Sequence, residues 1–178
     1  EAFVSKAARP AVQLTVALGA LLLALMQLWQ IRGEQSLTAA MGSIVFDGPA
    51  ALLQAAIVII AMISVFLIAD GEHFAALPAA LPGSEEERQA IKSGNQITEV
   101  YPLTLFAVSG MLLFTVANDL ITLFVALEML SLPLYLMAGL SRRRRLASQE
   151  AALKYFLLGA FSSAFFLFGA AYLYGFSG

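Results

Sequence analysis

Two ionisable side chains stand inside long apolar stretches of this sequence and could carry proton chemistry. Glu128 lies near the middle of Asn118–Leu140, and Lys154 lies in the next apolar stretch. A charged side chain at this depth of a bilayer costs roughly 2.5–3.5 kcal/mol on insertion scales, so it needs a partner, protein or water beside it. Attraction by the lysine favours the carboxylate, whereas desolvation favours the neutral acid. The pair therefore predicts a proton relay; a static ion pair that fixes helix packing is the alternative.

The depths of the two side chains also favour a pair. Glu128 is about nine residues, or roughly 13 Å, from the tight turn at Asn118-Asp119. If the last helix begins near Leu146, Lys154 lies roughly 12 Å from the opposite side. The two levels would then differ by a few ångströms in a slab of about 30 Å, a gap that a lysine side chain covers. The alternative for Lys154 is that its amine snorkels to the membrane surface.

Further residues near the pair could assist it. Pro133 removes a backbone hydrogen bond and clashes with the carbonyl of Met129, which predicts a kink that admits water; an ordinary membrane-helix proline is the alternative. Glu99 lies at the inner end of the preceding apolar stretch and is either a relay group or a solvated helix-end carboxylate. Small residues on the last helix indicate close packing or, alternatively, a water-lined path: Gly159, Ser162, Ser163 and Gly169.

The composition identifies a polytopic membrane protein. Hydrophobic residues make up 60% of the 178 and charged residues only 12%, whereas soluble domains have about 25% charged residues. The chain has no cysteine, which excludes disulfides, cysteine-ligated iron–sulfur clusters and thiolate zinc sites within it. One histidine, His73, cannot build a metal site alone. The sequence contains no nucleotide-binding fingerprint, P-loop or nucleophile motif.

We expect an all-α, polytopic transmembrane bundle with five spanning helices. The spans are about 11–31, 50–69, 101–117, 119–140 and 151–174. The third is marginal at about 25 Å, and the turn after it makes the third and fourth spans antiparallel neighbours. Between spans, Ser43–Phe46 suggests a short strand ended by the turn signal Asp47-Gly48-Pro49. Ser84, with Glu87 three residues on, has the spacing of a capping box for a short surface helix.

The loop charges predict the orientation. With the N-terminus in the cytoplasm, eight Lys and Arg side chains face inward and Arg32 alone faces outward, which places the C-terminus outside. Arg142–Arg145 would then anchor the inner surface. The chain begins without methionine and stops directly after an apolar run, so we expect it to be a piece of a longer protein.

Two stretches carry a resemblance to a known family. NDLITLFVALEMLSLPLYLMAGL and EAALKYFLLGAFSSAFFLFGAAYLYG closely resemble the subunit N family of bacterial respiratory complex I, the proton-translocating NADH:quinone oxidoreductase (NDH-1). The motif E-x-x-S-L-P-L-Y, from Glu128 to Tyr135, is shared with the related antiporter-like subunits. The A-L-K-Y-F-x-L-G-A-F-S-S stretch, from Ala152 to Ser163, points to subunit N.

The resemblance implies roles for three residues. Glu128 matches the family's essential mid-membrane glutamate, Lys154 matches the lysine on the following helix, and Glu99 aligns with a carboxylate at the start of the preceding helix. Residues 1–100 would be the N-terminal transmembrane helices with a cytoplasmic loop over 70–100. Residues 101–178 would be the start of the antiporter-like, proton-translocating repeat. The family's first helix and everything beyond the sixth would be missing.

The resemblance also implies the setting. The chain would be a non-redox translocase subunit of the respiratory chain, in the bacterial plasma (inner) membrane, and would bind no cofactor or metal itself. Partner subunits would carry FMN and iron–sulfur clusters, oxidise NADH and reduce quinone, and sister antiporter-like subunits would lie beside it. Two alternatives stay open: a subunit of a multi-subunit sodium/proton antiporter, and a structural membrane scaffold. No feature suggests binding to nucleic acid.

Overall fold

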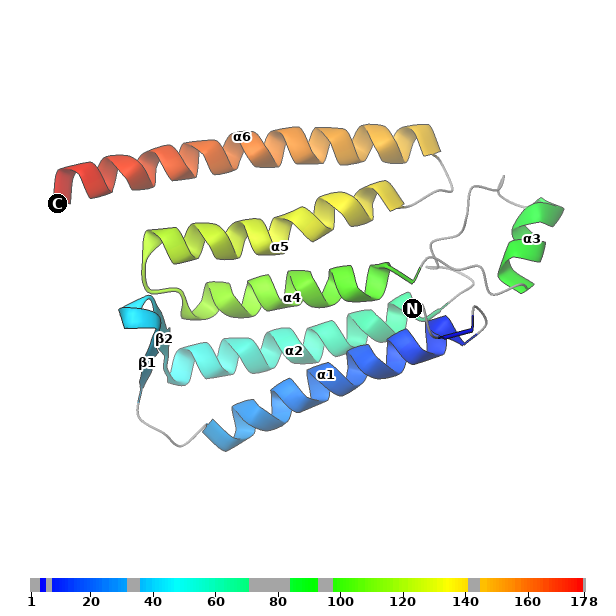
Figure 1. Ribbon diagram of the computed structural model, residues 1–178, viewed down its shortest axis with the longest axis horizontal. Coiled ribbons are helices and arrows are strands. Elements are labelled where there is room, and N and C mark those ends of the chain that lie inside the picture. The colour runs from blue at the N-terminus through cyan, green and yellow to red at the C-terminus, as the bar shows by residue number, and fades with distance from the viewer. Residues whose placement is uncertain are drawn as a thin grey trace.

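The computed structural model describes residues 4–5, 8–31, 36–70, 84–92, 98–140 and 145–177. The elements follow in the order α1 (Arg9–Ile31), β1 (Leu37–Ala39), the 3-10 turn η1 (Ala40–Gly42), β2 (Ile44–Phe46), α2 (Gly48–Ile68), α3 (Glu85–Lys92), α4 (Val100–Val116), α5 (Leu120–Leu140) and α6 (Arg145–Ser177). Figure 1 shows the five long helices side by side in the order α1, α2, α4, α5 and α6. The β-hairpin lies at one end of this row and the short helix α3 at the other; we call these the hairpin end and the α3 end.

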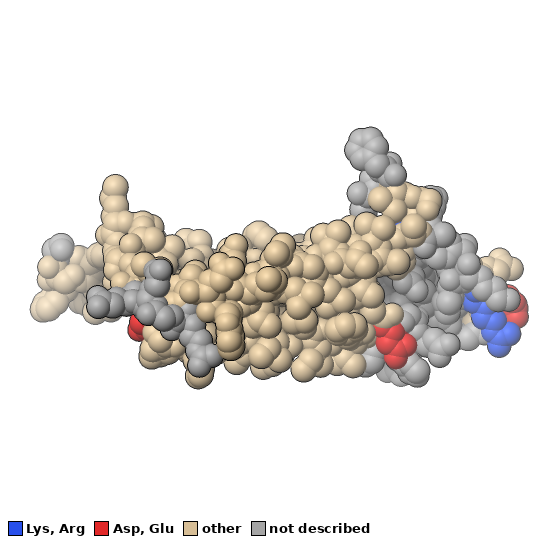
Figure 2. Space-filling model, turned by 90° about the horizontal axis from the view of Figure 1, so that it is seen from below, with Lys and Arg blue, Asp and Glu red and all other residues tan. Residues whose placement is uncertain are grey.

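The all-helical membrane architecture predicted from the sequence is confirmed. Four helices, α1, α2, α5 and α6, are long and apolar enough to cross a membrane, whereas the fifth, α4, is apolar but has only 17 residues. Large apolar side chains such as Leu23 and Phe161 are exposed on the outside of the row. In Figure 2 the middle of the visible face carries no acidic or basic colour, and the charged side chains lie toward its ends.

Two aspartates start the helices that follow the hairpin and the tight turn. Asp47 caps α2, and its Oδ1 accepts a hydrogen bond from the backbone N–H of Ala50 at 2.9 Å. The Asp47-Gly48-Pro49 signal is thus a helix start as well as a strand end, because proline is favoured in the first turn of a helix. Asp119 caps α5 in the same way and accepts hydrogen bonds from the backbone N–H and the hydroxyl of Thr122, at 2.8 and 2.7 Å.

The predicted strand at Ser43–Phe46 is present as β2, but its partner β1 was not predicted from the sequence. The turn between them uses left-handed backbone at Ala40 and Met41, with φ of 49° and 57°. Ala and Met give no turn signal, and Gly42, whose φ is 95°, is the one turn-favouring residue of η1, which is too little to reveal the hairpin from the sequence. Asn118 fixes the hairpin to the α4–α5 turn, because its backbone N–H donates to the carbonyl of Ser43 at 2.9 Å.

The last two predicted elements differ in extent. The span expected over 151–174 is the 33-residue helix α6, since the polar residues before it continue the helix. The surface helix expected after Ser84 is α3. Several predicted features lie outside the described residues: the loop with His73, the side chain of Glu87 and the residues Arg142–Arg144.

The core of the row lies where α2 packs between α1 and α4. Its buried side chains are mostly small or β-branched and include Ala17, Val58, Ala61 and Val65. Gln54 is the buried polar residue of α2, and its Nε2 donates to the carbonyl oxygen of Leu112 on α4 at 2.9 Å. This bond satisfies an amide in an apolar region and ties α2 to α4.

Candidate functional site

Glu128 lies on the face of α5 that packs against α6. Side chains spaced three and four residues apart share one face of a helix, and from Phe124 onward this spacing selects Glu128, Ser131, Tyr135 and Ala138. Three of these positions contact α6. Phe124 stacks on Phe166 with ring centroids 6.3 Å apart, Tyr135 meets Tyr155 edge-on at 4.6 Å, and Ser148 donates to the carbonyl of Ala138 at 2.6 Å. We call this contact the α5–α6 seam.

The same spacing recurs on α6. The half-buried residues of α6 are Ser148, Ala152, Gly159, Ser163 and Phe166, and they form the α6 side of the seam. The helices run antiparallel, so the Phe124–Phe166 contact sets the register. Glu128, four residues after Phe124, is therefore level with position 162, next to Ser163.

The carboxyl group of Glu128 is partly unsatisfied. Among the described residues, its Oε1 is the one buried side-chain nitrogen or oxygen without a hydrogen-bond partner. Leaving a buried acceptor unpaired costs about 1–3 kcal/mol, and more if the group is charged. A carboxyl group in this position needs a proton, water or a movable donor, which makes it the strongest candidate for proton chemistry in the described chain.

The opposite face of α5 packs on α4 at very short range. A Cβ placed on Gly110 would lie 2.8 Å from the carbonyl carbon of Met129 and 2.8 Å from the Cα of Leu130. Only glycine permits this approach of the two backbones. The contact adjoins Glu128 and holds its turn of α5 against α4. Pro133 is fully buried and lies within the continuous helix α5; its kink stays a prediction.

Lys154 has a different partner from the one expected. Its amine forms an ion pair with Glu150, one turn earlier on α6, and the two side chains are 69% and 64% exposed. No ion pair joins Lys154 to Glu128, both of which the structure describes.

The sequence predicts that Glu128 and Lys154 differ in depth by only a few ångströms, but the difference in the structure is larger. Gly139 packs against Ala152, so Lys154 is level with Met137. That level is about nine residues, or roughly 13 Å, from Glu128 along α5. The sequence estimate failed because it counted Lys154 from the start of α6, whereas α6 extends beyond the end of α5 at the α3 end (Figure 1).

Glu99, the third predicted relay residue, lies away from the seam. It precedes the first turn of α4, its side chain makes no capping hydrogen bond, and it is exposed. It therefore sits at the α3 end of the row, in the position of a helix-end carboxylate.

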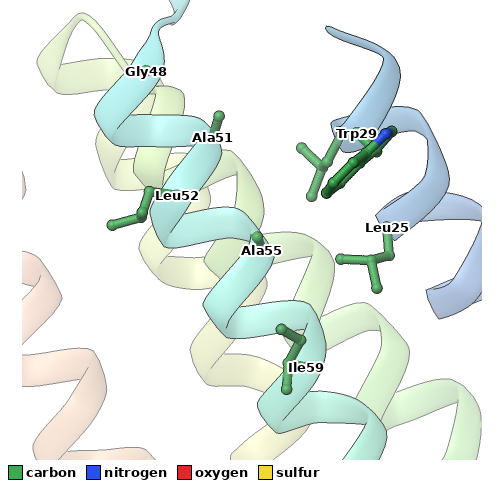
Figure 3. A pocket seen from close by; sticks show the side chains of 8 residues that line it. Leu25, Trp29, Gly48, Ala51, Leu52, Ala55 and Ile59 are labelled. Carbon is green, nitrogen blue, oxygen red and sulfur yellow. The ribbon is translucent and has the colours of Figure 1, made fainter. Parts of the chain in front are cut away.

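Three hollows elsewhere on the described surface lack comparable chemistry. The largest apolar one, about 530 Å³, lies between α1 and α2; Leu25 and Trp29 of α1 face Ala55 and Ile59 of α2 across it (Figure 3). A second, of about 360 Å³, reaches Gln54 between α1, α2 and α4. A third, of about 600 Å³, contains Asp119 at the hairpin end. Within the described residues no group of three or more acidic or histidine side chains could hold a metal ion.

The fold and the site together define a class: a multi-pass, all-helical membrane protein with an unpaired carboxyl group inside one helix. Comparison with known proteins identifies a particular family within this class. Residues 117–178, which contain α5 and α6, match the family described as the transmembrane region of NADH:quinone oxidoreductase/Mrp antiporter proteins.

Relatives resemble the chain over its whole length. It is 54% identical to NADH-quinone oxidoreductase subunit N of Thermobifida fusca, over 100% of this chain and 34% of that protein. It is 52% identical to the subunit N of Acidothermus cellulolyticus, over 99% of this chain and 35% of that protein. A chain of respiratory complex I from Thermus thermophilus, solved with bound aureothin, superposes with a TM-score of 0.68 at 35% identity, over 93% of this chain and 32% of that one. The chain thus belongs to the NADH-quinone oxidoreductase subunit N family, and it spans about a third of the length of these relatives.

Proposed function

We propose that this chain is part of a proton-translocating membrane subunit of NADH:quinone oxidoreductase, in which Glu128 takes up and releases the proton. Partner subunits that carry FMN and iron–sulfur clusters would oxidise NADH and reduce quinone, and sister antiporter-like subunits would adjoin this one. The observation that carries the proposal is the buried, unpaired Oε1 of Glu128 in the middle of α5. Residues 101–178 would begin the translocating repeat, and the N-terminus would face the cytoplasm.

Lys154 acts on Glu128 from a distance in this proposal. The backbone level of Lys154 is roughly 13 Å from that of Glu128, and the bond of its amine to Glu150 holds the positive charge farther away still. A movement of the amine along the seam toward Glu128 increases the attraction and releases the proton, and its return to Glu150 restores uptake.

Replacement of Glu128 in the full-length subunit tests this proposal. The variants Glu128→Gln and Glu128→Asp would be assembled into the complete enzyme in sealed vesicles, and NADH oxidation and proton uptake would be measured together. We expect Glu128→Gln to lower the number of protons moved per NADH while the complex stays assembled, and Glu128→Asp to retain part of the activity.

Two other carboxylates serve as controls. Glu86 on α3 is exposed, so Glu86→Gln makes the same chemical change away from the seam and should leave pumping unchanged. Glu99→Gln should have a smaller effect than Glu128→Gln, because Glu99 lies at the end of α4. Normal proton stoichiometry in Glu128→Gln would instead support a scaffold whose carboxyl group only packs.

A further inference from the structure

The hollow between α1 and α2 is a wedge that opens at the hairpin end. Helix α1 diverges from α2 toward that end (Figure 1), and a space of about 530 Å³ lies between them. Toward the α3 end the two helices close on each other and bury small and branched side chains such as Ala17, Leu21 and Val65. We call this space the α1–α2 wedge; Leu25, Leu28 and Trp29 line it from α1, and the α2 face from Gly48 to Ile59 lines it from the other side.

The wedge opens to the outside of the row. Its rim side chains Trp29, Leu52 and Ile59 are exposed, whereas Ala51 and Ala55 on its floor are half-buried. Apart from the indole of Trp29, the lining side chains are apolar, so a water molecule would not find there the two to four polar partners it needs. The surroundings of a membrane-spanning helix at this depth are acyl chains rather than water. Hydrocarbon is therefore the medium that fills the wedge.

The length of the wedge matches one leaflet of a bilayer. Gly48 and Ile59 are separated by eleven positions on α2, which corresponds to roughly 16 Å along the helix axis. Half of a hydrocarbon core of about 30 Å is about 15 Å. Trp29 lies two residues before the end of α1, at the open end of the wedge, which is the level that tryptophan favours at a membrane interface. The wedge thus runs from the interface to near the middle of the bilayer.

This shape selects a flexible chain over another helix. A helix with its side chains is about 10–12 Å across, and one that spans the membrane needs a groove of about 30 Å. The wedge instead narrows to the closed core of α1 and α2 after about half that distance. An acyl chain of one leaflet has the required length and bends to follow a narrowing space.

The open end of the wedge favours a positively charged headgroup. Asp47 directly precedes Gly48 and is exposed, and its Oδ1 caps α2. Among the described residues, the charged side chains at the hairpin end are Asp47 and Asp119, and both are acidic. A carboxylate beside the opening attracts the ammonium group of an amine-bearing lipid and repels a headgroup with net negative charge.

We propose that the α1–α2 wedge binds one acyl chain of a phospholipid from the leaflet at the hairpin end, with an amine-bearing headgroup beside Asp47. The chain covers the apolar floor between the helices and holds α1 at its distance from α2. This site is independent of the role of Glu128, because α4 separates α1 and α2 from the α5–α6 seam (Figure 1).

Photolabelling of the complete enzyme in vesicles tests the proposal. The probe is phosphatidylethanolamine with a diazirine in the middle of one acyl chain, added as a small fraction of phosphatidylglycerol vesicles, and mass spectrometry identifies the labelled residues. We expect label at Ala55 and the side chains around it. Excess unlabelled phosphatidylethanolamine should displace the probe, whereas added phosphatidylglycerol should not. A wedge without label in the native enzyme, as when another helix fills it, would overturn the inference.

Filling the wedge with a side chain provides the second test. Ala55→Trp places an indole on the floor and should abolish the label. Leu53→Trp is the matched control, since Leu53 is exposed on α2 at a similar level but outside the wedge, and the label should persist. Label that persists in an assembled Ala55→Trp enzyme would show that the probe reaches these residues without occupying the wedge, and the inference would fail.

Removal of one charge tests the headgroup and does not depend on the assembly of Ala55→Trp. Asparagine caps helices as well as aspartate does, so Asp47→Asn keeps the start of α2 and removes only the charge. We expect the preference for phosphatidylethanolamine over phosphatidylglycerol in displacing the probe to fall by about two- to fivefold, the range of an exposed ion pair. An unchanged preference would overturn the assignment of the headgroup to Asp47.

Discussion

The close contact at Gly110 leads to a sharp prediction, because a single methyl group should separate two helices. In Gly110→Ala, the new Cβ would lie 2.8 Å from two backbone carbons of α5, where ordinary contact begins at 3.4 Å. Both contacts are to backbone, so no side chain can turn aside. Helices α4 and α5 must move apart by at least about 0.6 Å, and overpacking of this kind costs typically 1–3 kcal/mol.

Gly19 provides the matched control on α1. A Cβ there would meet nothing within 4 Å, so Gly19→Ala should be neutral or should stabilise by about 0.5–1 kcal/mol through the lower entropy of the unfolded chain. Thermal unfolding of the two full-length variants in detergent measures the difference. Because this chain spans about a third of its relatives' length, the shift per kcal/mol should be smaller than the roughly 2–4 °C that is typical of 150–250 residues. Equal melting temperatures for Gly110→Ala and Gly19→Ala would refute the close packing of α4 on α5.

Three further predictions follow from single contacts. Gln54→Leu removes the hydrogen bond to Leu112 and should destabilise the protein by about 0.6 kcal/mol, the average contribution of a side-chain hydrogen bond between membrane helices. An unchanged free energy of unfolding in chemical denaturation would contradict this hydrogen bond. The backbone N–H of Thr122 holds the pKa of Asp119 below its usual value, so the cap stabilises α5 above that ordinary value and is lost as the pH falls through the lowered one. Protection against hydrogen exchange at the start of α5, taken relative to the intrinsic rate at each pH, should accordingly fall in acid and be low at all pH values in Asp119→Ala; strong protection in that variant would exclude the cap. Lys154→Ala should lower proton pumping more than Lys154→Arg, and equal pumping in both would argue against a role for the charge.

The sequence predicts the five long helices well, because four of them contain an apolar run of membrane length and the fifth, α4, is a shorter apolar run. It marks Asp47 and Asp119 only as turn residues, and the structure shows that they also cap α2 and α5. It does not reveal β1, because three residues without a turn signal contain too little information. It misplaces Lys154 relative to Glu128, because the depth of a residue in one helix says nothing about the register between two helices.

The α5 side of the seam could be predicted from the sequence. The three-and-four spacing from Glu128 through Ser131 to Tyr135 is visible in the motif E-x-x-S-L-P-L-Y, and it places these polar groups on one helix face. What the sequence lacks is the partner surface. The contact of Phe124 with Phe166 and the fit of Tyr135 against Gly159 depend on how α5 and α6 slide past each other, which only the packed helices determine.

The most direct measurement of the central claim is infrared difference spectroscopy of the complete enzyme with and without NADH and quinone. If Glu128 holds and releases the proton, a carboxyl C=O band appears or disappears with turnover, and this band is absent in Glu128→Gln. An identical set of carboxyl bands in the native enzyme and in Glu128→Gln would contradict the claim that this residue changes its protonation.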